Sequence, residues 1–167
     1  ETPWGIMKFL HHAEVNGDLP RMVSVQNAYN LLNRIYELGS SEIFHREGVG
    51  LLAYSPLAQG YLTGKYMNGA LPQGSRKQLF DRLQRYETPA ADQAIASYMD
   101  VAKKYGVDAS QLANQFVTTR DFVTSNIIGA TSMEQLELAV TSVDLELTEE
   151  MLADIETVHL TAPNICP

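Results

Sequence analysis

The sequence predicts an α/β fold built on a parallel sheet that is incomplete on its own. Three short apolar runs have the character of strands, and segments with helical spacing separate them, an order typical of parallel sheets. A free-standing sheet of this kind usually has about five strands, and a closed eight-stranded barrel needs about 250 residues. The chain has 167 residues, so we expect one domain with exposed sheet edges that another chain segment or a second copy completes.

Composition and charge exclude several classes of function. Hydrophobic residues make up 45% of the chain and charged residues 19%, which is enough to bury a core. The net charge of −8 argues against nucleic acid as a partner, and no apolar stretch reaches the roughly 18 residues that cross a membrane. The single cysteine, Cys166, cannot form an internal disulfide, and we expect an incidental thiol in the frayed tail of a cytoplasmic protein.

Helix and strand patterns alternate through the first third of the chain. The pair Thr2-Pro3 predicts a helix start, and Asn16-Gly17 ends the helical run. Residues 22–27 form an alternating, β-branched run that predicts a strand ending in polar residues. Residues 40–48 predict a short capped helix with a glycine stop, and the apolar run 49–54 predicts the next strand.

The periodicity then disappears over residues 55–89, where Pro, Gly, Ser and Gln accumulate. A loop longer than about 15 residues inside a compact domain is more often functional than idle. We therefore expect a binding loop here.

Helical spacing returns in the last part of the chain. It covers residues 94–102 and stops at Gly106, and a second helix follows from a cap at Ser110 to Val117. The remaining elements, in order, are a strand over residues 126–130, a helix over residues 133–143, and a last helix that Thr148 caps.

The C-terminal ends of the strands are where a parallel barrel carries its functional groups. Gln26 can offer a donor and an acceptor to a carboxamide, and Tyr54 offers a flat face to a ring. Together they suit a nicotinamide. Taken singly, the simpler interpretations are favoured, namely a polar residue that finishes a strand and an aromatic residue of the core.

The third strand end has the outline of a phosphate site. Gly129 allows close approach of the backbone, and Thr131 and Ser132 open a helix whose free N–H groups attract anions. Helix capping explains the same pattern equally well. Lys65 and Arg76 in the long loop can supply cationic contacts, although two basic residues in a solvated loop usually have no such role.

The sequence predicts no metal site and no other common catalytic motif. His11 and His12 are adjacent on a helix and point about 100° apart, while His45 and His159 have no Cys or paired carboxylates at ligand spacing. The serine-hydrolase elbow, the Walker loop and the Gly-x-Gly-x-x-Gly motif are absent from the sequence.

Three longer motifs contain these strand ends: VQNAYNLLNR at residues 25–34, AYSPLAQGYLTGKY at 53–66 and IGATSMEQL at 128–136. Together they resemble the last three strand motifs of the aldo-keto reductase family. The likeness covers essentially the whole chain and is closest to the bacterial branch of the tyrosine-auxotrophy-suppressor type, which also resembles potassium-channel β subunits. It implies the C-terminal part of a (β/α)8 TIM barrel, with residues 1–167 as a single fragment whose cofactor-binding loop spans 55–89.

The resemblance also implies NADPH as the cofactor and assigns its contacts. Gln26 would hold the nicotinamide carboxamide and Tyr54 would stack on the ring. Residues implied for the other parts are Ser55, Pro56, Leu57, Ala58 and Gln59 around the pyrophosphate, Lys65 and Arg76 as cationic contacts, and Gly129, Thr131 and Gln135 for the adenosine and its 2′-phosphate. Where the family usually places a Glu and an Asn against adenine, this chain has Leu138 and Ala139.

The family places its catalytic Asp, Tyr, Lys and His before the segment that Glu1-Thr2-Pro3-Trp4-Gly5 resembles. In such enzymes the tyrosine protonates the carbonyl oxygen while hydride leaves the nicotinamide. The resemblance therefore assigns no catalytic residue to this chain. Because the chain begins with Glu1 rather than Met, we expect a fragment whose partner is the missing N-terminal half of the barrel.

Two functions remain open at this point. The first is the C-terminal half of an NADPH-dependent oxidoreductase that reduces small aldehydes or ketones, inactive as a fragment. The second is a non-catalytic nucleotide-binding or assembly module that forms homo-oligomers through its exposed sheet edges. Whether the fragment alone holds NADPH is also open.

Overall fold

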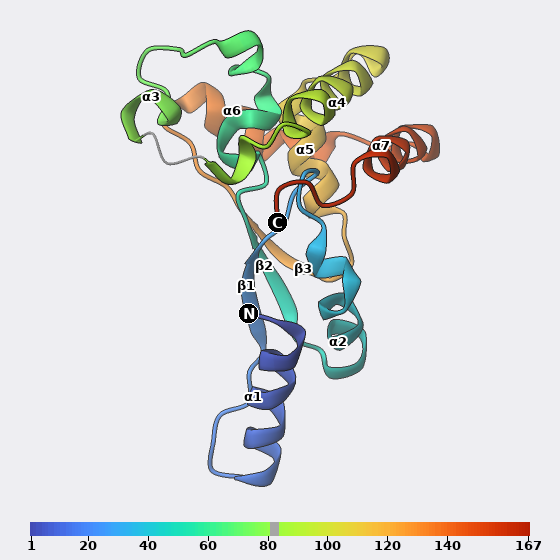
Figure 1. Ribbon diagram of the computed structural model, residues 1–167. Coiled ribbons are helices and arrows are strands. Elements are labelled where there is room, and N and C mark those ends of the chain that lie inside the picture. Colours follow the sequence, from blue (N-terminus) through green and yellow to red (C-terminus); the bar gives the residue numbers. More distant parts are fainter. Residues whose placement is uncertain (81–83) are drawn as a thin grey trace.

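A computed structural model describes residues 1–80 and 84–167, which contain one parallel sheet of three strands in the order β1-β2-β3 (Figure 1). The chain belongs to the α/β class, as the alternation of patterns predicts. Its helices and strands are α1 (Pro3–Val15), β1 (Ser24–Ala28), α2 (Ser40–Glu47), β2 (Gly50–Tyr54), α3 (Arg76–Phe80), α4 (Ala91–Tyr105), α5 (Ala109–Thr118), β3 (Val123–Ile127), α6 (Met133–Thr141) and α7 (Glu149–Thr161).

Local capping chemistry sets several helix ends. The Thr2 hydroxyl accepts a hydrogen bond from the Gly5 amide at 3.1 Å, and Pro3 occupies the first helical position of α1. Helix α4 ends where Gly106 adopts a left-handed conformation with φ of 65°. The expected Ser110 cap of α5 is wrong, because the Asp108 carboxylate accepts hydrogen bonds from the amides of residues 110 and 111 and thereby caps the helix.

The predicted position of the third strand is also wrong. Strand β3 covers Val123–Ile127 rather than residues 126–130, because Ile127 lies in register with Tyr54, the last residue of β2. Beyond that point no neighbouring β2 backbone remains for pairing, so residues 128–130 form a loop. The register also shifts between Leu51 and Leu52.

A close contact at the start of β2 requires glycine. A Cβ atom added to Gly50 would lie 1.8 Å from the Thr124 hydroxyl oxygen of β3. Strands β2 and β3 therefore approach here only because residue 50 has no side chain.

The segment after β2 has more local structure than a loop prediction over residues 55–89 implies. Within its described residues it contains 3₁₀ turns at Ala58–Thr63, Met67–Gly69 and Gln84–Tyr86 as well as α3. Residues 81–83 of the predicted loop lie outside the described residues.

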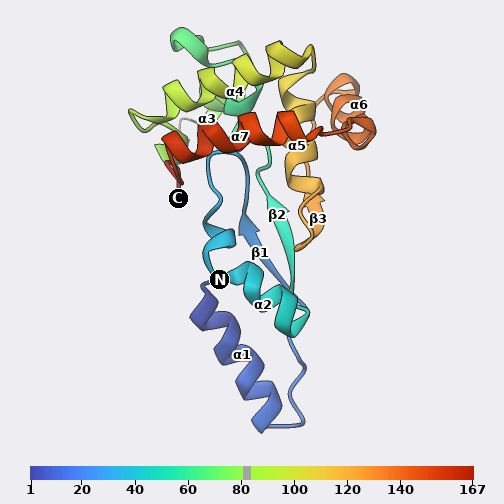
Figure 2. The ribbon, with the colours of Figure 1, turned by 90° about the vertical axis from the view of Figure 1, so that its right-hand side faces the viewer.

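The helices gather mainly beyond one end of the sheet. The strands point toward a group formed by α3, α4, α5, α6 and α7, whereas α1 projects from the opposite end beside α2 (Figures 1 and 2). Helices α4 and α7 pack together, and α5 packs on β3. Tyr29 contributes to this core by stacking on Phe116 at 6.0 Å and meeting Phe122 edge-on at 5.3 Å.

The C-terminal tail is part of the core, so the expectation of a frayed tail is wrong. Cys166 is fully buried, and its backbone amide donates to the Leu32 carbonyl at 3.2 Å. The Asn164 side-chain oxygen accepts a hydrogen bond from the Arg34 amide at 2.7 Å. Tail residues thus fill a gap beside the segment that follows β1.

The two faces of the sheet differ in exposure. Val25, Leu51 and Ala53 are buried on one face. Residues that alternate with them, Gln26, Leu52, Tyr54, Ser125 and Ile127, lie on the other face and are half-buried or exposed. In parallel sheets both faces are normally covered, so this face and the outer edges of β1 and β3 are open within the described chain.

The described helices are too short or too polar for any of them to cross a membrane.

Candidate functional site at the strand ends

Strand register brings the first two predicted site residues onto one surface. Ala28 of β1 lies opposite Tyr54 of β2, and Tyr54 lies opposite Ile127 of β3. Gln26 precedes Ala28 by two positions and therefore points to the same face as Tyr54. Gln26 is exposed and Tyr54 is half-buried. Both side chains thus lie on the open face, where a flat polar ring can reach them.

Four of the six residues that follow β2 have left-handed backbone conformations, and residues 55–60 are called the left-handed segment below. Ser55, Ala58 and Gln59 have φ values of 58°, 48° and 57°, and Gly60 has 100°. Non-glycine residues rarely adopt this conformation, and clusters of such residues occur at ligand-binding sites. Two turns hold it, since the Ala58 amide donates to the Ser55 carbonyl at 2.9 Å and the Gly60 amide donates to the Leu57 carbonyl at 2.8 Å.

The side chains of this segment include a buried polar atom without a partner. Pro56 and Ala58 are buried and support the loop from below, while Leu57 is half-buried. The buried Oε1 atom of Gln59 has no hydrogen-bond partner within the described part of the chain. A buried acceptor without a partner is costly unless a ligand or water satisfies it.

The predicted cationic residues have different surroundings. Lys65 is exposed, and its ammonium group lies 5.2 Å from the centre of the Tyr66 ring. Arg76 is exposed at the start of α3. The next residue, Lys77, lies 2.8 Å from the Glu87 carboxylate. It also lies 5.5 Å from the ring centre of Tyr61, so it is the lysine that joins the two ends of the long loop.

Lys77, Glu87 and Tyr61 form a cluster in which the pKa values of Glu87 and Tyr61 are shifted. The hydrogen bond from Lys77 lowers the pKa of Glu87, and the Tyr61 hydroxyl also donates to that carboxylate. Burial raises the pKa of Tyr61 to about 12. The Lys77 charge is therefore largely neutralised by Glu87, and Lys65 is the better-placed cation for an anionic ligand.

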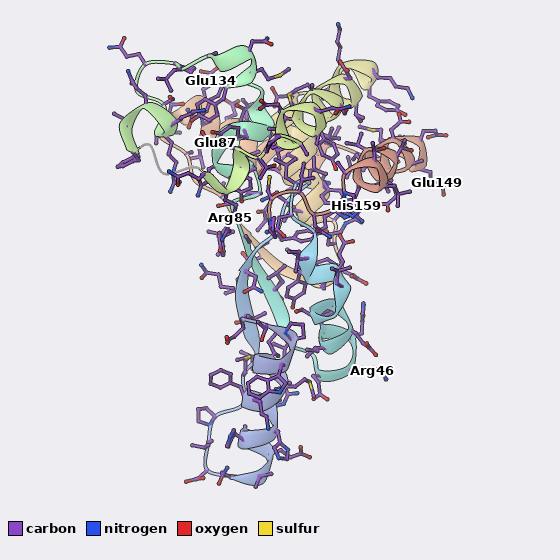
Figure 3. The ribbon with its side chains drawn as sticks, viewed as in Figure 1. Arg46, Arg85, Glu87, Glu134, Glu149 and His159 are labelled. Atoms are coloured by element: carbon purple, nitrogen blue, oxygen red, sulfur yellow. The ribbon has the colours of Figure 1, made fainter. Side chains whose placement is uncertain are left out.

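Arg85 contacts the candidate site, and sequence reasoning missed it. Its side chain lies at the junction of the sheet and the upper helices, and Glu87 lies farther toward the helices (Figure 3). A hydrogen bond to Tyr54 raises the pKa of the Arg85 guanidinium. No sequence motif predicts this role for Arg85, because the long loop after β2 must fold back before Arg85 can contact the strand.

At the third strand end, helix capping is what the structure contains. The Ser132 hydroxyl accepts from the Gln135 amide at 3.2 Å and caps α6. The Gln135 side-chain oxygen accepts from the Thr131 amide at 3.0 Å and from the Thr131 hydroxyl at 3.2 Å. Thr131 and Gln135 are thus brought together but satisfy each other, both are exposed, and space around Gly129 is open. Leu138 and Ala139 are half-buried on α6.

Two surface hollows lie near the start of β3. They have volumes of about 440 and 450 Å³ and share Thr119 and Arg120 among their lining residues. Neither hollow is lined by a residue of the predicted cofactor set. Within residues 1–80 and 84–167, no three His, Cys, Asp or Glu side chains group as metal ligands.

Comparison with known proteins places these features in a family. The aldo/keto reductase family model matches residues 2–159. The chain is 50% identical over 159 residues to protein tas of Escherichia coli K12, covering 95% of this chain and 46% of that protein. It is 38% identical over 138 residues to L-glyceraldehyde 3-phosphate reductase of the same bacterium, covering 78% and 40%.

A third relative has a different kind of name. The chain is 31% identical over 156 residues to a putative voltage-gated potassium channel subunit beta of Schizosaccharomyces pombe, covering 89% of this chain and 45% of that protein. The chain spans less than half the length of each of these relatives.

Proposed function

Because the chain belongs to the aldo/keto reductase family, we propose that it supplies the cofactor-binding half of an oxidoreductase that uses NADPH to reduce aldehydes or ketones. The single observation that carries this proposal is the arrangement at the strand ends. Gln26 and Tyr54 share the open face of the sheet, and the left-handed segment from Ser55 to Gly60 begins immediately beyond them. The cytoplasm remains the predicted location.

In the proposed complex each part of the site has a binding role. The Gln26 amide donates to and accepts from the nicotinamide carboxamide, and the Tyr54 ring stacks on one face of the nicotinamide. Backbone N–H groups of residues 55–59 and the Lys65 ammonium surround the pyrophosphate. Thr131 and Gln135 exchange their mutual hydrogen bonds for contacts with the 2′-phosphate.

The bound NADPH would supply the hydride for carbonyl reduction. This chain's residues orient the ring and leave one face of it accessible from the open side of the sheet. The proton for the carbonyl oxygen is proposed to come from the N-terminal half of the barrel, the proposed partner of this chain. According to this proposal the chain alone does not catalyse carbonyl reduction.

Titration with NADPH tests the proposal. We expect the chain to enhance the fluorescence of the reduced nicotinamide, and Gln26→Leu to weaken binding about tenfold, equivalent to roughly 1.4 kcal/mol. The matched control is Gln93→Leu, because Gln93 is exposed on α4 and does not belong to the predicted cofactor set. Equal loss in both variants, or no binding by the unmodified chain, would contradict the proposal.

A non-catalytic assembly module is the second candidate, favoured by the open sheet edges. Tight oligomers of the chain that do not bind NADPH would support this candidate over the first. Sedimentation velocity with and without NADPH distinguishes the two candidate functions. The cofactor-binding half of an oxidoreductase binds nucleotide whatever its oligomeric state.

A further inference from the structure

The side chain of Asn30 joins three segments of the chain. It is fully buried in the segment that follows β1. Its Oδ1 atom accepts from the Leu32 amide at 3.0 Å, and its Nδ2 atom donates to the Ser55 carbonyl at 2.9 Å and to the Tyr86 hydroxyl at 3.1 Å. Both ends of the long loop, at residues 55 and 86, therefore meet on one amide.

The contact with Ser55 acts where the backbone is strained. Ser55 has a φ of 58°, which a non-glycine residue adopts only when its surroundings hold it. The carbonyl before it, that of Tyr54, accepts from the Tyr29 amide at 3.3 Å, and its own carbonyl accepts from Asn30. Residues 29 and 30 thus fix both peptide groups that flank Ser55, and through them the start of the left-handed segment.

The contact with Tyr86 holds the other end of the loop. Tyr86 is fully buried, and its ring lies 6.1 Å from that of Tyr61. Asn30 reaches its hydroxyl from a sequence distance of 56 residues. One buried amide therefore contacts both the start of the loop at Ser55 and its return at Tyr86.

We propose that Asn30 is a positioning residue of the cofactor site, which sets the backbone of residues 55–60 for the pyrophosphate before the ligand arrives. The inference rests on the function proposed above. Asn30 is buried beneath the segment and acts through Ser55. Preorganisation of this kind raises affinity because less conformational freedom is lost on binding.

A positioning role and a general structural role affect different parts of the ligand. Loss of a positioning residue weakens contacts with one part of the ligand, whereas loss of a structural residue weakens contacts with all parts. Asn30 holds the segment assigned to the pyrophosphate, whereas the adenosine and 2′-phosphate are assigned to Gly129, Thr131 and Gln135 on another loop. 2′-AMP carries the adenosine and the 2′-phosphate but no 5′-phosphate, so it lacks the pyrophosphate and is the matching probe. Loss of Asn30 should weaken the binding of NADPH and leave the binding of 2′-AMP unchanged.

The experiment compares three variants of the full chain. Asn30→Leu removes all three hydrogen bonds, and Tyr86→Phe removes one while Asn30 stays in place. Asn114→Leu is the control, since Asn114 is equally buried on α5 and its side-chain atoms have no partner in the described structure. We expect about tenfold weaker NADPH binding in Asn30→Leu, a smaller loss in Tyr86→Phe, and less than twofold changes for 2′-AMP and for Asn114→Leu.

Amide hydrogen exchange provides a readout that needs no ligand. Residues 55–64 should exchange faster in Asn30→Leu and Tyr86→Phe, while α7 keeps its protection. Equal weakening of both ligands, or unchanged exchange in the loop, would overturn the inference. If the unmodified chain binds neither ligand, the proposed function fails and faster loop exchange still identifies Asn30 as the residue that orders the segment.

Discussion

Arg34 is a charged residue buried in the protein core. Its guanidinium lies 2.7 Å from both the Glu37 and the Glu156 carboxylates and 5.4 Å from the Phe116 ring centre. Burial alone lowers the pKa of Arg34 and raises that of Glu37. Hydrogen bonds between them prevail, so the pKa of Arg34 is raised and that of Glu37 is lowered. Both groups are therefore charged in the folded protein.

This pairing predicts a pH-dependent contribution to stability. Since the folded pKa of Glu37 lies below its ordinary value of 4.5, its contribution is complete above about pH 4.5 and is lost as the pH falls through the folded pKa. Glu37→Gln should lower the free energy of unfolding by roughly 3 kcal/mol at pH 7. The difference from the unmodified chain should shrink below pH 4.5, as urea unfolding at several pH values can measure.

Glu42→Gln is the matched control, because Glu42 pairs with Arg46 on the surface with both side chains largely exposed. Exposed pairs contribute about 0.5 kcal/mol or less. If the Glu37 variant is as stable at pH 7 as the Glu42 variant, the ion pair between Arg34 and Glu37 does not contribute to the stability of the fold.

The position of a residue along a strand could be predicted from the sequence. Gln26 and Tyr54 were expected near strand ends, and the strand register brings them to one face; their binding roles stay a prediction. Asn30, Arg85 and Glu156 could not be, because their partners lie far away in the sequence. The Asn30–Tyr86 and Arg34–Glu156 contacts span 56 and 122 residues, distances at which a single sequence carries no periodic signal.

At the scale of elements, α6 and the turn after it carry an unpartnered apolar stripe. Met133, Leu136, Val140 and Val143 follow helical spacing, and their exposed fractions are 77%, 38%, 56% and 59%. An amphipathic helix usually buries such a stripe. From its exposure we predict that copies of the chain associate through this stripe.

The double variant Met133→Glu with Val140→Lys should reduce self-association at high concentration. The thermal midpoint should change little, since the new charges suit the first and last turns of α6. Light scattering and dye binding to apolar surface would measure the effect. Leu160→Lys is the control, a similar change at an exposed position in the last turn of α7; equal effects of both changes would exclude a specific role of the stripe.

Element boundaries were predictable where their cause is local. Thr2, Gly48, Gly106 and Thr148 end or begin helices through contacts within a few residues. Strand β3 was misplaced because its length is set by β2, its partner, and not by its own apolar run.

At the scale of the molecule, the sheet has one covered face and one open face. Parallel strands rarely stay uncovered, and the open face carries Gln26 and Tyr54. The exposed edges of β1 and β3 are the places where further parallel strands can pair. The alternation of helices and strands predicted this incomplete sheet, but only the strand register identified which face is open.

Complementation tests the proposed barrel closure. Mixed with the N-terminal half of a full-length relative such as protein tas, the chain should form a one-to-one complex that reduces a generic aldehyde with NADPH. Either half alone should be inactive. The complex made with Gln26→Leu should assemble but require more NADPH for half-maximal rate. If the chain alone reduces the aldehyde as fast as the complex does, the proposal that the N-terminal half supplies the catalytic residues is wrong.

The buried tail has a practical consequence. Cys166 is the chain's single thiol, and burial raises its pKa, so an alkylating reagent reaches it only after the tail has left the groove beside Leu32. The rate at which Cys166 is alkylated in native buffer therefore measures how often the last residues detach from the protein core. The same rate followed in rising urea would tell whether the tail leaves before the core or together with it.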